Sequence, residues 1–265
     1  MSENVGLGVA LVSLGGMLNG SFALPVKRMP GWRWENTWLV FSVVAMLVAP
    51  WLFAATTVPC LAEVYHRASG HAFSLVLLFG LGSGTGSMLF GLGITRLGLA
   101  LGFAIILGIS VSLGSLLPLA ILHPNQALSR PSHFLTAGTV LVILGIVFYA
   151  IAGRRREREA GPSAQDAPRT GFAGGLVICI FSGILSATLN LAFLYGKEFQ
   201  DLTLSLGGSA RVSANPIWAL ALTSMFIANG GYTIYLLQKN HSWRTFSGPG
   251  ITAGYWVGGI LMGAP

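Results

Sequence analysis

Long stretches without charge constrain this chain more than any other feature of its sequence. Eight apolar segments follow one another, and none carries Asp or Glu in its middle: 5–24, 37–56, 71–95, 97–122, 134–153, 171–196, 215–238 and 249–265. Each of the first seven is long enough to cross the roughly 30 Å hydrocarbon core of a bilayer as a helix. Because backbone polar groups in lipid must be satisfied within the segment, the sequence predicts an all-α, polytopic membrane helical bundle embedded in the lipid bilayer.

Composition argues against other classes of protein. Only 9% of the residues are charged, whereas about a quarter are charged in an average soluble domain. The net charge of +7 does not indicate nucleic-acid binding, because Lys and Arg lie almost entirely in the gaps between apolar segments. The two cysteines, Cys60 and Cys179, belong to no CxxC or Cys/His spacing, so we expect them to be unpaired. We therefore expect no nucleic-acid partner, no metal and no other cofactor.

The distribution of Lys and Arg predicts an orientation. Eleven of the fifteen lie in the gaps after segments one, three, five and seven, which alternate with the other gaps across the membrane. Positive charge collects on the cytoplasmic side, so we predict an N-terminus outside and a cytoplasmic, flexible polar linker at 154–170. The N-terminus has no Lys or Arg, unlike a secretory signal, so the first segment is expected to be a retained helix.

The first gap, FALPVKRMPGWRWENTW (22–38), concentrates cations and aromatic rings. Lys27, Arg28 and Arg33 would anchor it in the cytoplasm. Three tryptophans would lie at the boundary between water and lipid, where an indole can bury its ring and still form a hydrogen bond: Trp32, Trp34 and Trp38. A direct role of this stretch in substrate binding is the alternative.

Part of the first segment recurs in the sixth. In each, an Asn stands three residues before a Phe: Asn19 before Phe22, and Asn190 before Phe193. A repeat with an odd number of helices would place its second copy upside down in the membrane, which is the inverted-repeat plan of secondary transporters.

This plan predicts the domain organisation. Residues 1–153 would form a first five-helix repeat, 154–170 the linker, and 171–265 a second repeat with three helices. The last segment is short and ends without a polar anchor. We therefore expect a fragment that is truncated in its second repeat, with about eight of ten helices present.

The run GLGSGTGSMLFGLG (80–93) resembles a phosphate-binding loop, but it lacks the Lys of a P-loop and lies inside an apolar segment. The pairs Gly80/Gly84 and Gly82/Gly86 have the spacing that lets membrane helices approach closely. Close helix packing is the better interpretation. The third and fourth segments, separated only by Arg96 and its neighbours, predict a tight helical hairpin.

Uncharged polar side chains are the best candidates for a ligand site. Ser and Thr in membrane helices commonly bond to their own helix, whereas each Asn amide has two donors and an acceptor to satisfy. We select Asn19, Asn190 and Asn229 as candidate substrate-binding residues. With the aromatic faces of Tyr232 and Trp256, they would suit a sugar, which needs both hydroxyl contacts and a stacking surface.

Proton coupling usually requires an ionisable group within the membrane. No acid lies at mid-depth, and Glu35, at the mouth of the second segment, is the nearest candidate for a coupling residue. The alternative is a surface carboxylate that pairs with its neighbours Lys27, Arg28 and Arg33.

Two stretches carry a resemblance to a known family. The cationic first loop that ends in W-x-W-E, and FGLGITRLGLALGFAIILGISVSLGSLLPLAI (90–121), resemble the L-rhamnose–proton symporter family of the drug/metabolite transporter superfamily. The resemblance implies ten helices in two inverted halves, and a transport protein of the bacterial cell inner membrane with a periplasmic N-terminus. It also implies symport of L-rhamnose, or a closely related sugar, with protons by alternating access.

Two alternatives stay open. A related transporter of the superfamily could carry another small metabolite, because a fold indicates its substrate poorly. A polytopic membrane enzyme is the more distant alternative, since no His lies at mid-depth and no HExxH or GxSxG motif is present. We therefore expect a transporter that is not an enzyme.

Overall fold

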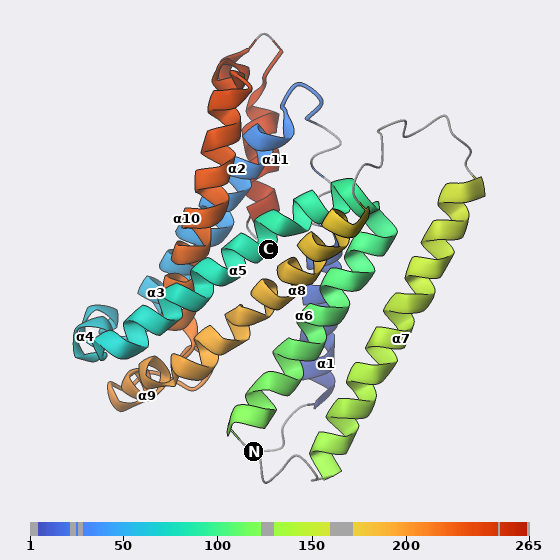
Figure 1. Ribbon diagram of the computed structural model, residues 1–265. Coiled ribbons are helices and arrows are strands. Elements are labelled where there is room, and N and C mark those ends of the chain that lie inside the picture. The colour runs from blue at the N-terminus through green and yellow to red at the C-terminus, as the bar shows by residue number, and fades with distance from the viewer. Residues whose placement is uncertain are drawn as a thin grey trace.

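The computed structural model describes residues 5–21, 25, 29–122, 130–159, 172–248 and 250–263, and these contain helices and no strand. Figure 1 shows their arrangement. The elements in chain order are α1 (Val5–Ser21), α2 (Trp34–Val43), η2 (Val44–Val48), α3 (Ala49–Thr57), α4 (Leu61–Arg67), α5 (Gly70–Leu97), α6 (Leu99–Leu122), α7 (Arg130–Glu159), α8 (Phe172–Tyr195), α9 (Lys197–Ser205), α10 (Asn215–Lys239), η5 (Ser242–Ser247) and α11 (Ala253–Gly263).

The helices match the apolar segments of the sequence. Within the described residues, five helical stretches are long and apolar enough to cross a membrane: 34–57, 70–94, 101–121, 173–205 and 215–239. Shorter apolar helices cover 6–17 and 132–145. The all-helical membrane fold is therefore confirmed. α7 continues to Glu159, so helix extends into the expected linker of 154–170, while residues 160–171 lie outside the described part.

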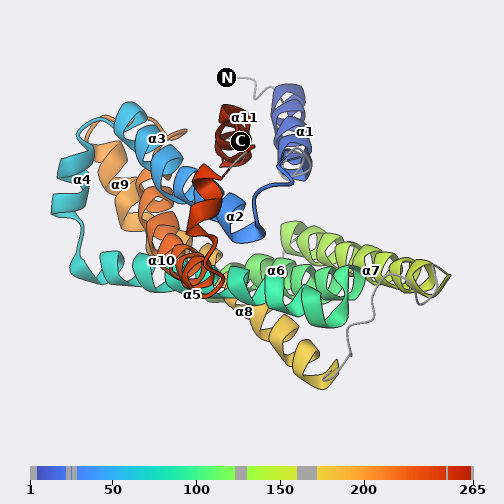
Figure 2. The ribbon, with the colours of Figure 1, turned by 90° about the horizontal axis from the view of Figure 1, so that it is seen from above.

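Two long, tilted helices occupy the middle of the bundle. α5 and α8 pack against each other along their length, with α2, α3, α10 and α11 on one side and α6 and α7 on the other (Figure 1 and Figure 2). α5 also contacts α10 extensively, and α6 packs on both α8 and α7. This arrangement makes α5 the element through which the two sides of the bundle are joined.

Glycines explain how α5 approaches two helices at once. On one face, a Cβ at Gly84 would lie 2.6 Å from the carbonyl oxygen of Met225 in α10. On the other face, a Cβ at Gly86 would lie 2.6 Å from the backbone nitrogen of Ser186 in α8. Real Cβ atoms do not approach other atoms so closely, so both sites require glycine. The predicted close packing of the two glycine pairs is confirmed.

The predicted hairpin is also confirmed. α5 ends at Leu97 and α6 begins at Leu99, so Gly98 alone turns the chain, with a φ of 84° that favours glycine. The backbone N–H of Gly98 donates to the carbonyl of Ile94 at 2.9 Å. Arg96 is thereby held at the tip of the hairpin.

The second transmembrane segment is not a uniform helix. Its middle, η2, is a π-helical stretch that lies between α2 and α3. Pro50 stands at the start of α3 and cannot donate a backbone hydrogen bond, and its ring would clash with a carbonyl one turn earlier. A π-bulge accommodates this, and such irregularities commonly mark functional positions in helices.

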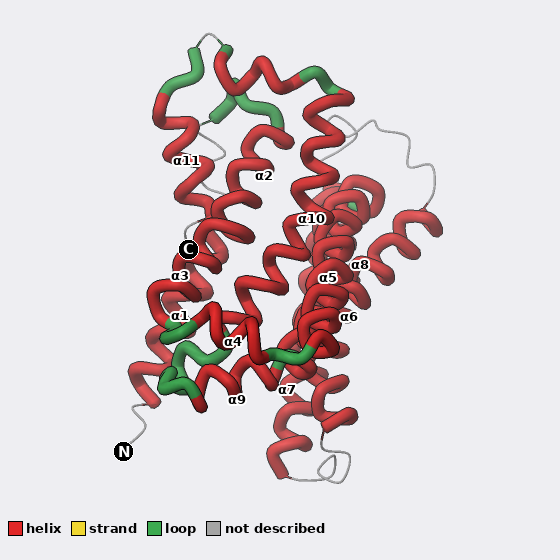
Figure 3. Tube along the Cα trace, turned by 90° about the vertical axis from the view of Figure 1, so that its left-hand side faces the viewer, coloured by secondary structure: helices red, strands yellow, loops and turns green. Residues whose placement is uncertain are grey.

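Short helices that the sequence did not predict close one end of the bundle. α4 and α9 lie side by side there, as Figure 3 shows. Phe199 of α9 is fully buried and contacts Tyr65 of α4 edge-on, with 5.9 Å between ring centroids. We call this the Glu198 end, where α3 ends and α10 begins. The opposite end, where α2 begins and α10 ends, is called the Glu35 end.

Candidate functional site

Glu35 lies in the first turn of α2, and its side chain is buried, with 5% of its surface exposed. One carboxylate oxygen accepts hydrogen bonds from Ser242 Oγ at 2.7 Å and from Asn240 Nδ2 at 3.0 Å. These donors follow α10, about 200 residues later in the chain. Arg33 does not pair with the carboxylate, since its guanidinium donates to the carbonyl oxygen of Asn240 at 3.1 Å. The interpretation of Glu35 as a surface carboxylate paired with Arg33 is therefore wrong.

Three buried polar atoms between Trp32 and Ser42 have no hydrogen-bond partner within the described part of the chain. They are Trp32 Nε1, Asn36 Oδ1 and Ser42 Oγ. Asn36 is otherwise anchored, since its Nδ2 donates to the carbonyl of Ser242 at 3.0 Å. Most buried polar groups in proteins are paired, so each exception calls for an explanation. Together they offer a donor just before α2 (Trp32) and an acceptor and a hydroxyl on α2 itself (Asn36 and Ser42).

An aromatic cluster adjoins these atoms. The Trp32 ring meets Phe246, Tyr255 and Trp256 edge-on, with centroid distances between 5.2 and 5.8 Å. Trp32 is 6% exposed, so its ring packs inside the protein instead of facing lipid. Its neighbour Trp34 is half exposed and stacks on Trp38, as expected of a boundary residue. Lys27 and Arg28 lie outside the described residues.

Asn229 and Asn190 contact different helices. Asn229 is buried, and its amide donates to the carbonyls of Gly84 in α5 and Met225 in α10, each at 3.3 Å. This amide ties two helices together. Asn190 is exposed on α8, with its amide close to Gly114 of α6 and a long, 3.4 Å bond to Ala187. Asn19 belongs to α1, but its side chain lies outside the described set.

The structure separates the two aromatic candidates as well. Tyr232 is half-buried on α10 and stacks on Tyr235 at 6.4 Å between centroids. Trp256 belongs to the Glu35 end, where it contacts Trp32 and keeps 42% of its surface exposed. Of the six predicted site residues, Glu35 and Trp256 are thus brought to the same end of the bundle. The roles of all six in binding and coupling stay predictions.

Sequence reasoning missed the polar contacts at the Glu198 end. Glu198 accepts from the backbone N–H and the hydroxyl of Ser69, at 2.7 and 2.6 Å. Asn215 at the start of α10 donates to Thr57 Oγ1 at 2.8 Å. The hydroxyl of Tyr65 donates to the carbonyl of Pro216 at 3.0 Å, and burial raises the pKa of Tyr65. A Ser-Gly pair before a long apolar segment was the available signal for the cap formed by Ser69.

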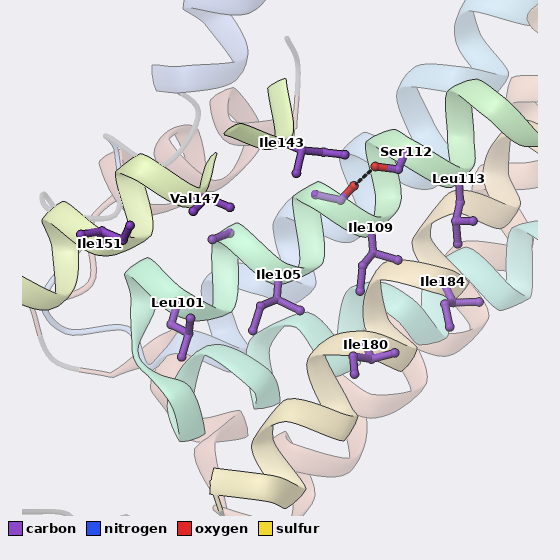
Figure 4. A pocket seen from close by; sticks show the side chains of 12 residues that line it. Leu101, Ile105, Ile109, Ser112, Leu113, Ile143, Val147, Ile151, Ile180 and Ile184 are labelled. Atoms are coloured by element: carbon purple, nitrogen blue, oxygen red, sulfur yellow. Dashed lines mark hydrogen bonds between the residues drawn. The ribbon is translucent and has the colours of Figure 1, made fainter. Parts of the chain in front are cut away.

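A separate groove lies between α6, α7 and α8 (Figure 4). Its volume is about 670 Å³, and its lining is almost entirely aliphatic, with residues such as Leu101, Ile105, Ile109 and Ile180. The hydroxyl of Ser112, at its edge, already donates to the carbonyl of Gly108 at 2.6 Å. A groove without free polar groups cannot recognise sugar hydroxyls, so it is not a candidate for the sugar site.

Cysteines and acids provide no metal centre in the described residues. No group of three or more His, Cys, Asp or Glu side chains there could hold an ion. Both cysteines are free, with Cys60 exposed and Cys179 buried in α8 against Gly93 of α5. The expectation that the two cysteines are unpaired is therefore confirmed.

Helices of this length and apolarity define a multi-pass membrane protein. The comparison with protein families then places it: the chain belongs to the L-rhamnose-proton symport protein (RhaT) family, whose profile matches residues 1–261. This is a family of transporters and not of enzymes, and the predicted resemblance is confirmed.

Individual relatives carry the name of the same family. An L-rhamnose-proton symporter of Klebsiella pneumoniae is 26% identical over 241 residues, which cover 90% of this chain and 69% of the relative. The protein of the same name from Escherichia coli O9:H4 is 27% identical over the same coverage, and that of an Enterobacter species is 26% identical over 242 residues. No solved structure matches the chain.

Proposed function

We propose that this protein imports L-rhamnose or a closely related sugar together with protons across the bacterial inner membrane, by alternating access. Besides family membership, the main observation that supports this proposal is the carboxylate of Glu35. It is the buried acidic side chain of the described helices, and it joins the beginning of α2 to the segment after α10. A transporter of another small metabolite is the alternative that the low identity to the relatives leaves open.

The neutral donors around Glu35 suggest how a proton could be coupled to movement. Hydrogen bonds from Ser242 and Asn240 favour the charged carboxylate. Protonation of Glu35 removes the negative charge that strengthens both hydrogen bonds, and would therefore favour movement of α2 away from η5. Once the Glu35 end has opened to water, hydration favours the charged carboxylate, and the proton would be released on that side.

The membrane potential can drive such a cycle. Each net positive charge that enters gains about 2.3 kcal/mol per 100 mV. This corresponds to a roughly 40-fold accumulation of the sugar, since about 1.4 kcal/mol is a factor of ten.

The same end offers contacts for a sugar. Among the described residues, Trp32 Nε1 is a donor and Asn36 Oδ1 an acceptor without a partner, and the exposed face of Trp256 could stack on a sugar ring. These atoms support a binding site between α2, η5 and α11. Asn19, Asn190, Asn229 and Tyr232 stay in the proposal as groups that a sugar would meet further along its path.

Contacts between α2 and α10 support the inverted-repeat plan. Glu35 at the start of α2 binds the segment after α10, and Asn215 at the start of α10 binds Thr57 at the end of α3. A tryptophan follows three residues after each polar residue, Trp38 after Glu35 and Trp218 after Asn215. We propose on this basis that 1–153 and 171–265 are related halves joined by the 154–170 linker.

The same plan gives an orientation. Arg33, Arg96 and the end of α7 lie at one end of the bundle, since each helix between them crosses it once. Positive charge collects in the cytoplasm. We therefore propose that the Glu35 end and the linker are cytoplasmic and that the N-terminus is periplasmic.

Uptake of labelled L-rhamnose into proteoliposomes tests the function. The protein should accumulate the sugar when an inward proton gradient is imposed, and a protonophore should abolish the accumulation. Glu35→Gln keeps the hydrogen-bond geometry but cannot release a proton. We expect it to lose gradient-driven accumulation at least about tenfold while it still exchanges labelled for unlabelled sugar.

The exchange measurement separates coupling from folding. Glu198→Gln, at the opposite end, is the matched control and should keep gradient-driven uptake. A Glu35→Gln protein that accumulates sugar as well as the wild type would refute the coupling role. Folded wild-type protein that shows neither uptake nor exchange of L-rhamnose would refute the substrate.

A further inference from the structure

We propose that the groove between α6, α7 and α8 is a binding site for one anionic phospholipid, with an acyl chain in the groove and the phosphate at Arg96 and Arg155. The groove is unrelated to the polar candidates for sugar and proton, so the proposal is independent of the transport function. Figure 4 shows side chains of all three helices pointing into the same space.

The dimensions of the groove favour an acyl chain. Its lining runs along α6 from Leu101 to Leu113, a length of about 18 Å at 1.5 Å per residue. One leaflet contributes half of the roughly 30 Å hydrocarbon core, so the groove covers the depth of a single leaflet. It is lined by exposed aliphatic side chains such as Val147 and Ile151 of α7, which suits methylene groups.

A protein helix is too thick for the same space. Spread over about 18 Å of helix length, the volume of about 670 Å³ gives a mean cross-section of roughly 37 Å². A helix about 10 Å across requires about 80 Å². An acyl chain therefore fits within the groove, whereas another helix of this chain or of a second copy would project out of it.

Two cations stand at one end of the groove. Arg96 precedes Leu101 across the α5–α6 hairpin, and its guanidinium lies beside Gly174 at the start of α8. Arg155 follows Ile151 by one helical turn on the same face of α7, and it is exposed. Neither guanidinium has an ion-pair partner within the described part of the chain.

The positive charge of Arg96 and Arg155 favours anionic lipids over zwitterionic ones. Lys and Arg next to a membrane surface attract anionic headgroups by about 1 kcal/mol each. An aliphatic groove with two arginines at its end therefore matches a lipid whose headgroup carries a net negative charge, such as phosphatidylglycerol, better than a zwitterionic lipid. Two such contacts predict a roughly 30-fold preference.

Lipid titration of the purified full chain in detergent tests the proposal. Native mass spectrometry would count bound phosphatidylglycerol and phosphatidylcholine of identical chains. We expect one phosphatidylglycerol per protein, bound about 30-fold more tightly than phosphatidylcholine. Arg96→Gln combined with Arg155→Gln should remove the preference but keep weak binding of both lipids. Equal affinity of the wild type for the two lipids would refute the role of the arginines.

A glycine in the groove provides the second variant. A Cβ at Gly108 meets nothing within 4 Å, so Gly108→Leu fills the groove without a clash inside the protein. Gly145→Leu is the matched control, because Gly145 is exposed on α7 two residues from the groove-lining Ile143, and it also has free space. We expect Gly108→Leu to lose binding of both lipids and Gly145→Leu to keep it.

The remaining outcomes are also decisive. Lipid binding that survives in Gly108→Leu would refute the groove as the acyl site. A change in oligomeric mass in Gly108→Leu, with unchanged lipid counts, would show that a second copy occupies the groove. Equal helical content by circular dichroism in all variants ensures that a loss of binding is not a loss of fold.

Discussion

At both ends of the α2 and α10 pair, a polar side chain at the start of one helix bonds to the segment after the other, but the two ends differ in their surroundings. At the Glu198 end, Asn215 and Tyr65 each find a partner across the contact between α3, α4 and α10. A continuous apolar cluster around Phe199 and Val76 closes this end. At the Glu35 end, a buried carboxylate makes the equivalent contact, and three buried polar atoms of Trp32 and α2 have no partner among the described residues.

The two ends differ in how completely their buried polar groups are hydrogen-bonded. Buried polar groups without partners destabilise the closed arrangement by about 1–3 kcal/mol each. At the Glu198 end, the hydrogen bonds of Tyr65 and Asn215 stabilise the contact between helices. At the Glu35 end, the groups without partners among the described residues would form hydrogen bonds only with a ligand or water. A contact with unsatisfied groups opens more easily than one without them, which agrees with the proposed site of proton and sugar binding.

The discontinuity in the second transmembrane segment lies between these two ends. η2 separates α2, which belongs to the Glu35 end, from α3, which belongs to the Glu198 end. Gly263 of α11 packs directly on this stretch, where a Cβ would lie 2.9 Å from the backbone nitrogen of Ala45. The two ends are therefore joined through an irregular stretch, which would let one end move while the other keeps its contacts.

Removal of an aromatic ring from each end should give the largest difference. Phe199→Ala empties a fully buried site and should lower the free energy of unfolding by about 3–5 kcal/mol. Phe246→Ala removes a half-buried ring from the aromatic cluster at the other end and should cost less than about 2 kcal/mol. Denaturant unfolding in detergent, followed by circular dichroism, measures both. Equal losses would contradict the idea that the Glu198 end is the more stable one.

Deletion of one hydroxyl from each end should sharpen the comparison. Tyr65→Phe breaks a hydrogen bond to Pro216 and should lower the free energy of unfolding by about 1 kcal/mol. Ser42→Ala removes a buried hydroxyl that has no partner among the described residues, so it should raise the free energy of unfolding by about 1 kcal/mol. The same unfolding measurement applies. A loss of about 1 kcal/mol or more in Ser42→Ala would show that this hydroxyl is satisfied in solution.

Much of the fold could be predicted from the sequence because it depends on local pattern. The apolar segments predicted the long helices, and the short gap at Arg96 predicted the hairpin. The spacing of the pairs Gly80/Gly84 and Gly82/Gly86 predicted the close packing of α5. Each of these features is fixed by residues that are near one another in the chain or by a demand for space that only glycine meets.

The candidate site was harder to predict because its contacts join distant parts of the chain. Glu35 is buried only because Ser242, 207 residues later, returns to cover it. Trp32 is buried by rings that follow α10, and nothing in its own neighbourhood distinguishes it from Trp34. The short helices α4 and α9 escaped notice because 7 and 9 residues do not form a recognisable apolar segment.

The smallest expected effect comes from an exposed ion pair near the Glu198 end. The Arg67 guanidinium, 2.6 Å from Glu63, holds the pKa of that carboxyl below its usual value of 4.5. A lowered pKa in the folded protein contributes stability at pH values above the ordinary pKa, and this contribution is lost as the pH falls through the folded-state pKa.

Both groups are exposed, and solvent and salt screen their attraction. Glu63→Gln should therefore leave the unfolding midpoint at pH 7 unchanged within error and reduce its fall below pH 4.5 only slightly. A large shift at pH 7 that 1 M salt does not remove would show that α4 needs this pair to hold Tyr65 in place.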